Sequence, residues 1–118
     1  MTDDRRKTIA FICGMHFAEV THTNIYDYTR ASYFFLDYSV NGQEISVYDY
    51  ERKCYVSGRF SSLYDYGVSR YMDFRVERED IIDVYDYLTG SNLQVTCRGN
   101  DVSLFDYKAG RYFEYQLS

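Results

Sequence analysis

Leu104-Phe-Asp-Tyr-Lys-Ala-Gly-Arg-Tyr112 is the clearest copy of the unit that decides the fold of this chain. The unit has an aliphatic residue, an aromatic-Asp-Tyr tripeptide, four linker residues and, in four of its five copies, a closing Tyr. The tripeptides start 22, 16, 21 and 20 residues apart, at Tyr26-Asp27-Tyr28, Tyr48-Asp49-Tyr50, Tyr64-Asp65-Tyr66, Tyr85-Asp86-Tyr87 and Phe105-Asp106-Tyr107. Such recurrence indicates an internal repeat.

Each unit has the pattern of a β-hairpin. The four-residue linkers are polar on balance, and three of them contain Gly, as hairpin loops often do. The segments after the linkers alternate apolar and polar residues, which is typical of half-buried strands. Asn41-Gly42 predicts a type I′ turn between units. The fold class is therefore all-β: an antiparallel meander of hairpin repeats, curled into a barrel, propeller or flower.

The chain is long enough for one domain. Its 118 residues suffice for a single core, and the five-unit repeat occupies residues 25–118. For residues 1–24 we predict a β-hairpin that turns near Gly14-Met15 and joins the same domain. A short helix from Ala10 to Val20 is the alternative.

Composition narrows the class of protein. The chain has 15 Tyr and 8 Phe but no Trp and no Pro, a bias that favours β-structure. No apolar stretch is long enough for a transmembrane helix, so we predict no membrane partner. The odd number of widely spaced cysteines, Cys13, Cys54 and Cys97, predicts free thiols in the cytoplasm. The net charge is −5 and the arginines are scattered, which does not predict direct nucleic-acid binding.

The tyrosines fall on one face of the predicted sheet. We pair the residues that flank each linker, so that Tyr28 faces Tyr33 and Tyr50 faces Tyr55. The aliphatic residues then form the core, and the tyrosines form the outer face. These rings either clamp the hairpins as cross-strand pairs or bind a partner. The candidate partner-binding residues are Tyr28, Tyr33, Tyr50, Tyr55, Tyr66, Tyr71, Tyr107 and Tyr112.

The five aspartates of the tripeptides fall on the inner face, just before each loop. One interpretation is that each carboxylate accepts backbone N–H bonds from the loop that follows. The other is a ring of carboxylates at one end of a closed barrel that binds a cation such as Ca²⁺. The candidate residues for that site are Asp27, Asp49, Asp65, Asp86 and Asp106.

No motif for catalysis stands out. Cys13-Gly-Met-His16 has half of a metal-binding pattern, but no second half follows. His16 and His22 would lie too far apart along a strand to share a metal. A thiol in an apolar strand is usually inert. We therefore expect no enzyme activity, no cofactor and no metal outside the alternative at the aspartates.

The unit from Leu104 to Tyr112 resembles the YD repeats of bacterial Rhs-type shells, which also recur about every twenty residues. Here Gly110 follows Asp106 by four positions, whereas the YD repeat has three. The period and the small size also resemble the bacterial four-fold beta flower proteins. Both resemblances imply a curled all-β repeat without an enzyme activity attached.

These observations give a ranked set of expectations. The first is a non-catalytic protein-interaction module with an exposed Tyr/Asp surface. The second is a small acidic inhibitor, for example phage-encoded, that occupies a basic nucleic-acid groove of a target enzyme. The third is a cation or small-ligand site at the Asp-lined hairpin end. We also expect a homodimer if a sheet this short closes only by pairing with a second copy.

Overall fold

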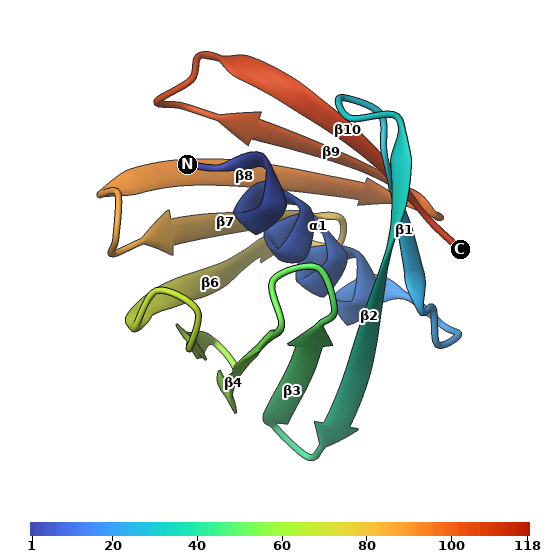
Figure 1. The fold of residues 1–118 in the computed structure, drawn as a ribbon, viewed down its shortest axis with the longest axis vertical. Helices are drawn as coiled ribbons and strands as arrows, with labels where there is room; N and C mark the ends of the chain where they lie inside the picture. Colours follow the sequence, from blue (N-terminus) through green and yellow to red (C-terminus); the bar gives the residue numbers. More distant parts are fainter.

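The hairpin units form ten antiparallel strands that close into one barrel, as the computed structural model of residues 1–118 shows (Figure 1). Each strand pairs with its neighbours in the chain, and β1 pairs with both β2 and β10. The all-β meander is confirmed, and its form is a closed barrel. The sheet closes within one chain, so closure needs no second copy. The strands are β1 (Asn24–Asp27), β2 (Ser32–Asn41), β3 (Glu44–Asp49), β4 (Cys54–Arg59), β5 (Ser62–Asp65), β6 (Arg70–Arg78), β7 (Ile81–Asp86), β8 (Ser91–Arg98), β9 (Asp101–Asp106) and β10 (Arg111–Leu117).

The predicted faces are right, but the predicted pairing partners are wrong by two residues. In the first unit Tyr33 pairs with Tyr26 and not with Tyr28, because the four loop residues begin at Tyr28. At the turn between units Asn41 pairs with Glu44, so the loop residues are Gly42 and Gln43. Positive φ occurs there only at Gly42, which fits a type II′ turn and not the predicted type I′. A register shift of two residues leaves every side chain on the same face of the sheet.

Residues 3–17 are helical, so the predicted N-terminal hairpin is wrong. The alternative, a helix, is right in type, but the helix spans Asp3–Phe17 and not Ala10 to Val20. Helix α1 (Asp3–Phe17) runs through the inside of the barrel (Figure 1). Its residues from Arg5 to Met15 are all buried. A surface helix shows a polar face and an apolar face, whereas a helix that is surrounded on all sides shows neither. The hairpin interpretation failed because this segment lacks the usual 3.6-residue pattern.

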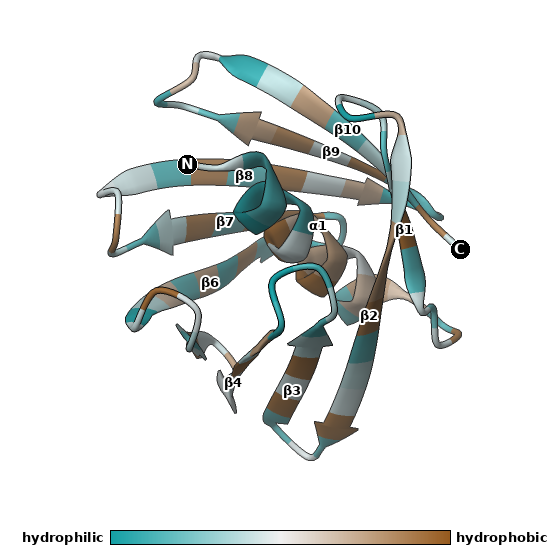
Figure 2. Cartoon of the chain, in the orientation of Figure 1, coloured by the Kyte–Doolittle hydropathy of each residue, from teal (hydrophilic) through white to brown (hydrophobic).

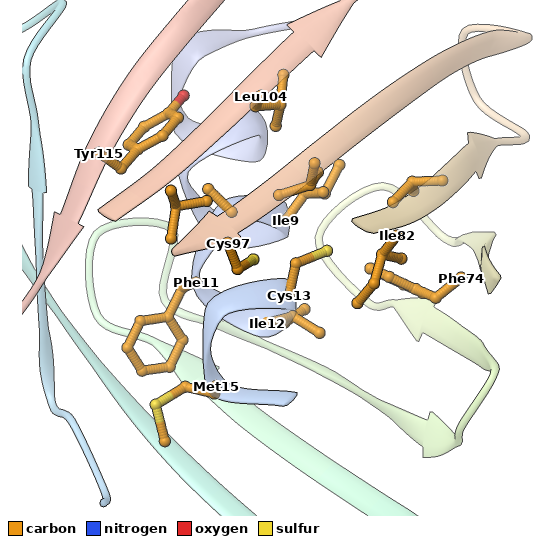
Figure 3. Close-up of a cluster of buried hydrophobic side chains, with 14 of the residues drawn as sticks. Ile9, Phe11, Ile12, Cys13, Met15, Phe74, Ile82, Cys97, Leu104 and Tyr115 are labelled. Atoms are coloured by element: carbon orange, nitrogen blue, oxygen red, sulfur yellow. The ribbon is translucent and has the colours of Figure 1, made fainter. Parts of the chain in front are cut away.

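The chemical character of α1 changes along its length. Figure 2 shows a hydrophilic N-terminal part followed by a hydrophobic part. The hydrophobic part carries Ile9, Phe11, Ile12 and Met15 into the centre of the barrel (Figure 3). Gly14 lies so close to the wall that an added Cβ would be 2.7 Å from a methyl group of Leu117. Gly14 therefore serves close helix–strand packing, not the predicted turn.

One hydrophobic core joins the helix to the strands. Figure 3 shows α1 side chains pointing toward Phe74, Ile82, Cys97, Leu104 and Tyr115 on the surrounding strands. The predicted core residues of the strands are buried, except Phe34, which is half-buried. The expected core residues that are buried are Ile25, Leu36, Ile45, Val47, Val56, Leu63, Met72, Phe74, Val84, Leu93, Val95, Leu104 and Phe113.

The hydrophilic part of α1 is held by buried ion pairs with the wall. The Lys7 ammonium lies 2.7 Å from both carboxylate oxygens of Asp49, and both side chains are fully buried. Arg5 donates two hydrogen bonds of 2.9 Å to Asp86 and one of 3.0 Å to Asp65. Arg6 donates a bond of 3.1 Å to Asp106. Each pair links the helix to a different hairpin unit.

Removal of one partner of the Lys7–Asp49 pair should destabilise the protein strongly. Lys7→Met leaves the buried carboxylate of Asp49 without this cation, at a cost of about 3–5 kcal/mol. Asp49→Asn should cost less, because the Lys7 ammonium keeps a second ion pair with Glu51 at 3.1 Å. The double variant removes both charges, so we expect it to cost less than the sum of the two single variants. Urea unfolding followed by circular dichroism measures all three. Arg75→Ala, at an exposed ion pair with Asp83, is the control. Additive effects of the two substitutions would contradict the pairing.

Candidate functional site

The outer wall of the barrel carries clusters of aromatic rings, one for each hairpin unit. In the first unit Tyr26 lies between Tyr28 and Tyr33, at centroid distances of 4.9 and 4.7 Å. Both contacts are edge-to-face, a favourable geometry for aromatic pairs. We call each such set an aromatic cluster. The others are Tyr48/Tyr50/Tyr55, Tyr64/Tyr66/Tyr71, Tyr85/Tyr87 and Phe105/Tyr107/Tyr112.

The central ring of a cluster differs in exposure from its two flanking rings. Tyr26, Tyr48, Tyr64 and Phe105 are half-buried, whereas the flanking rings face solvent. All eight candidate tyrosines are exposed, from 51% for Tyr50 to 65% for Tyr112. The rings therefore pack as cross-strand clamps, and the flanking rings also present aromatic surface to solvent.

The sequence pattern did not single out three exposed members of this surface, which are Tyr85, Tyr87 and Leu88. Tyr87 is 51% exposed and packs edge-to-face on Tyr85. Leu88 in the next loop is also exposed. They were left out because the fourth unit has Asn92 where the others have a closing Tyr. The place of Tyr85 and Tyr87 in the repeated tripeptide was the signal that could have found these two rings, and no such signal marks Leu88.

Carboxylates fix two of the exposed phenols. Tyr50 donates a hydrogen bond of 2.5 Å to Asp37, and Tyr87 donates one of 2.7 Å to Asp73. The hydrogen bond to the neighbouring carboxylate raises the pKa of each phenol. These aspartates lie on the outer face, so the aromatic surface is bordered by negative charge.

The five aspartates of the tripeptides lie together at one end of the barrel, which we call the Asp ring. All five are buried, with at most 1% of each residue exposed. Each accepts a backbone N–H bond from its own loop, as predicted; the partners, at 2.9–3.4 Å, are Thr29, Glu51, Gly67, Leu88 and Lys108. The loop interpretation of the aspartates is confirmed.

The positive charges within the Asp ring come from the chain itself. Arg5, Arg6 and Lys7 enter from α1, while Arg30 and Arg52 come from loops and bind Asp27 and Asp65 at 2.8 and 2.7 Å. No cluster of three or more metal-ligating side chains occurs in the chain. The alternative cation site at Asp27, Asp49, Asp65, Asp86 and Asp106 is therefore not supported, because side-chain cations already bind these carboxylates.

Two of the three cysteines, Cys13 and Cys97, are buried. All three cysteines are free. Burial raises the pKa of the Cys97 thiol to about 12 and that of the Cys13 thiol well above its ordinary value. Such thiols are protonated at neutral pH and are poor nucleophiles. His16 stacks on Phe60, with ring centroids 4.6 Å apart, and His22 is buried.

Comparison with protein-family models, curated proteins and solved structures finds no match for this chain. The resemblance to YD repeats and to beta flower proteins therefore stays a prediction. Helix α1 is neither long nor apolar enough to span a membrane.

Acid should weaken the attachment of α1 through Asp86. Burial raises the pKa of this carboxyl, but hydrogen bonds from Arg5 and Thr89 outweigh burial, and the net pKa is lowered from its ordinary value of 3.8. A lowered folded-state pKa gives stability that is complete above the unfolded pKa and is lost as the pH falls through the folded pKa. We expect the free energy of unfolding to fall below about pH 4.

The measurement is urea unfolding at pH 7 and at successively lower pH. Asp86→Asn should lower stability at pH 7 and flatten the acid dependence. Asp101→Asn, at an exposed residue of β9, is the matched control and should keep that dependence. An identical acid profile for wild type and Asp86→Asn would contradict this assignment.

Completion of the fourth aromatic cluster should stabilise the protein. Asn92 pairs directly with Tyr85, as Tyr71 pairs with Tyr64. Asn92→Tyr should add one edge-to-face contact, worth about 0.5–1.5 kcal/mol. Thermal unfolding with wild type as reference checks this, and Asn92→Leu controls for added apolar area. Equal melting temperatures for the Tyr and Leu variants would show that ring geometry contributes nothing.

Proposed function

We propose that this chain is a non-catalytic protein-interaction module that binds its partner through the aromatic clusters and the carboxylates beside them. The observation that carries the proposal is the exposure of the flanking tyrosines in every unit. A large apolar patch exposed on a soluble protein usually marks an interaction site. Tyr is favoured at such sites because it offers a large, rigid contact area with a hydroxyl group.

In this proposal the partner binds to the outside of the barrel, because the inside has no free space. The centre, where many barrels hold a small ligand, is filled by α1, whose residues Ile9 to Cys13 have no exposed surface. Edge-to-face packing holds the central rings in place before any partner arrives. A preorganised surface loses little conformational entropy on binding. The free thiols favour a reducing compartment such as the cytoplasm.

Charge distribution favours a second candidate, an acidic inhibitor of a protein with a basic groove. The Asp ring is neutralised from within by Arg and Lys. The net charge of −5 therefore resides mainly on the outer wall and the opposite end of the barrel. Exposed or half-buried acidic residues there include Asp37, Glu44, Asp73, Glu77, Glu79, Asp80, Asp83, Asp101 and Glu114. Such a surface would steer the chain toward a basic partner.

Affinity capture from the native host tests the proposal. The wild-type chain serves as bait beside four single variants, Tyr28→Ala, Tyr50→Ala, Tyr107→Ala and Tyr112→Ala. Each replaced ring is exposed and outside the core, so we expect the variants to fold, with circular dichroism as the check. At least one variant should lower partner recovery about tenfold, the effect of losing a central contact residue.

Val20→Ala, which removes an exposed apolar side chain outside the aromatic clusters, is the control and should keep the partner. Competition by DNA or RNA for the same partner, together with loss of binding at high salt, would favour the inhibitor function. Recovery that is equal for wild type and all folded Tyr variants would leave the clusters with a structural role only.

A further inference from the structure

A groove crosses the outer wall of the barrel from β2 to β6. Its volume is about 960 Å³. Ser39, Ser46 and Ser57 pair side by side along its floor, and the same row continues into Tyr64 and Tyr71. We call this feature the serine groove. The groove lies where the spacing between two repeat units is shortest: the tripeptides at Tyr48 and Tyr64 start 16 residues apart.

Aromatic rings form one end of the serine groove. Tyr64, Tyr66 and Tyr71 line it there and pack on one another at 4.7 and 4.8 Å. Tyr66 and Tyr71 are more than half exposed. Rigid rings of this kind provide flat apolar faces on which a ligand can pack.

Polar groups line the rest of the groove and are free to bind a ligand. Asn41, Glu44 and Arg59 follow the row next to the serines. Arg59 donates only its Nε–H, to Gln43 at 2.9 Å. Among the serines only Ser32 and Ser103 donate hydroxyl hydrogen bonds to the protein, so the serine hydroxyls of the groove remain available. The groove thus offers many donors beside an aromatic end.

The closed sheet limits how a peptide can bind here. The strands β3, β4 and β5, which form the floor of the groove, pair with neighbours on both sides, so a peptide that crosses them cannot join the sheet as an added strand. A peptide in the groove must bind with a backbone that needs no ladder hydrogen bonds. A polyproline II segment meets this condition, because its backbone has no internal hydrogen bonds and its carbonyls point outward. Its proline rings pack on aromatic side chains.

The length of the groove and the charged residues along it agree with a polyproline II segment as the ligand. Five neighbouring strands at about 4.8 Å spacing give the groove a span of roughly 19 Å. At about 3.1 Å per residue, this span holds about six residues of polyproline II. Glu44 lies within the groove opposite Arg59, and Asp73 pairs with Ser62 at its edge, so two carboxylates face one guanidinium there. A basic residue beside the prolines would therefore be favoured.

We propose that the serine groove binds a proline-rich protein segment in the polyproline II conformation, with a flanking Arg or Lys toward Glu44. This inference rests on the proposed function, because it names the class of partner that part of the same surface takes. The remaining aromatic clusters belong to the module whether or not the serine groove is used.

A synthetic proline peptide with a C-terminal arginine pair is the probe. A glycine-serine peptide of equal length with the same arginine pair is the control for charge alone. Isothermal titration calorimetry gives the Kd, and amide NMR shifts of the ¹⁵N-labelled chain locate the site. We expect binding of the proline peptide only, with shifts centred on Ser46, Ser57 and Tyr71.

Two variants test the two parts of the groove. Tyr71→Ala removes an aromatic face, and Ser57→Gln fills the floor without a change in charge. Each should raise the Kd about tenfold or more. Phe35→Ala is the matched control, because Phe35 is an exposed aromatic residue that lies outside the groove and outside the aromatic clusters. It should leave the Kd unchanged, and thermal unfolding verifies the fold of all three.

Three results would overturn the inference. They are no binding of the proline peptide, equal binding of the glycine-serine peptide, or an equal loss for Phe35→Ala and Tyr71→Ala. If affinity capture still shows a partner that depends on Tyr28 or Tyr107, only the serine groove inference fails. If neither assay depends on any tyrosine, the proposed function fails as well.

Discussion

The pairing of buried helix cations with the Asp ring is the interaction on which the rest of the structure depends. Arg5, Arg6 and Lys7 could not remain charged inside a barrel without carboxylates to receive them. The aspartates equally need the cations, because several carboxylates gathered at one barrel end would repel each other. Each Asp also accepts the backbone N–H bonds that form its loop. Helix and barrel are therefore parts of one cooperative unit, and neither is expected to persist without the other.

Because helix α1 and its ion pairs fill the inside of the barrel, only the outer wall is open to a binding partner. Strand side chains alternate between faces, so the residues on either side of each Asp point outward, and the repeat makes them aromatic. The same tripeptide thus places a carboxylate inside and two rings outside. This alternation separates the two roles: substitution of an exposed outer ring can change the surface while the Asp ring and the core stay intact.

The repeat departs from regularity at two places, and both alter the surface. Asn92 replaces a closing Tyr, so the fourth aromatic cluster has two rings instead of three. The short interval between the second and third units brings the serines of β2, β3 and β4 beside an aromatic cluster and creates the serine groove. The wall of the barrel is consequently not uniform, and one sector has a different binding chemistry from the others.

The sequence by itself determined the strands, their alternation and the two faces, because these follow from local residue patterns with a period of two. It also determined that each Asp forms its loop, an interaction within a few residues. Only the tertiary structure decided that the sheet closes on itself and that residues 3–17 form a helix inside it. Closure depends on contacts between β1 and β10, at opposite ends of the chain. A helix that is buried on all sides lacks the polar face by which a helix is recognised, and the partners of its charges lie 42 to 100 residues away.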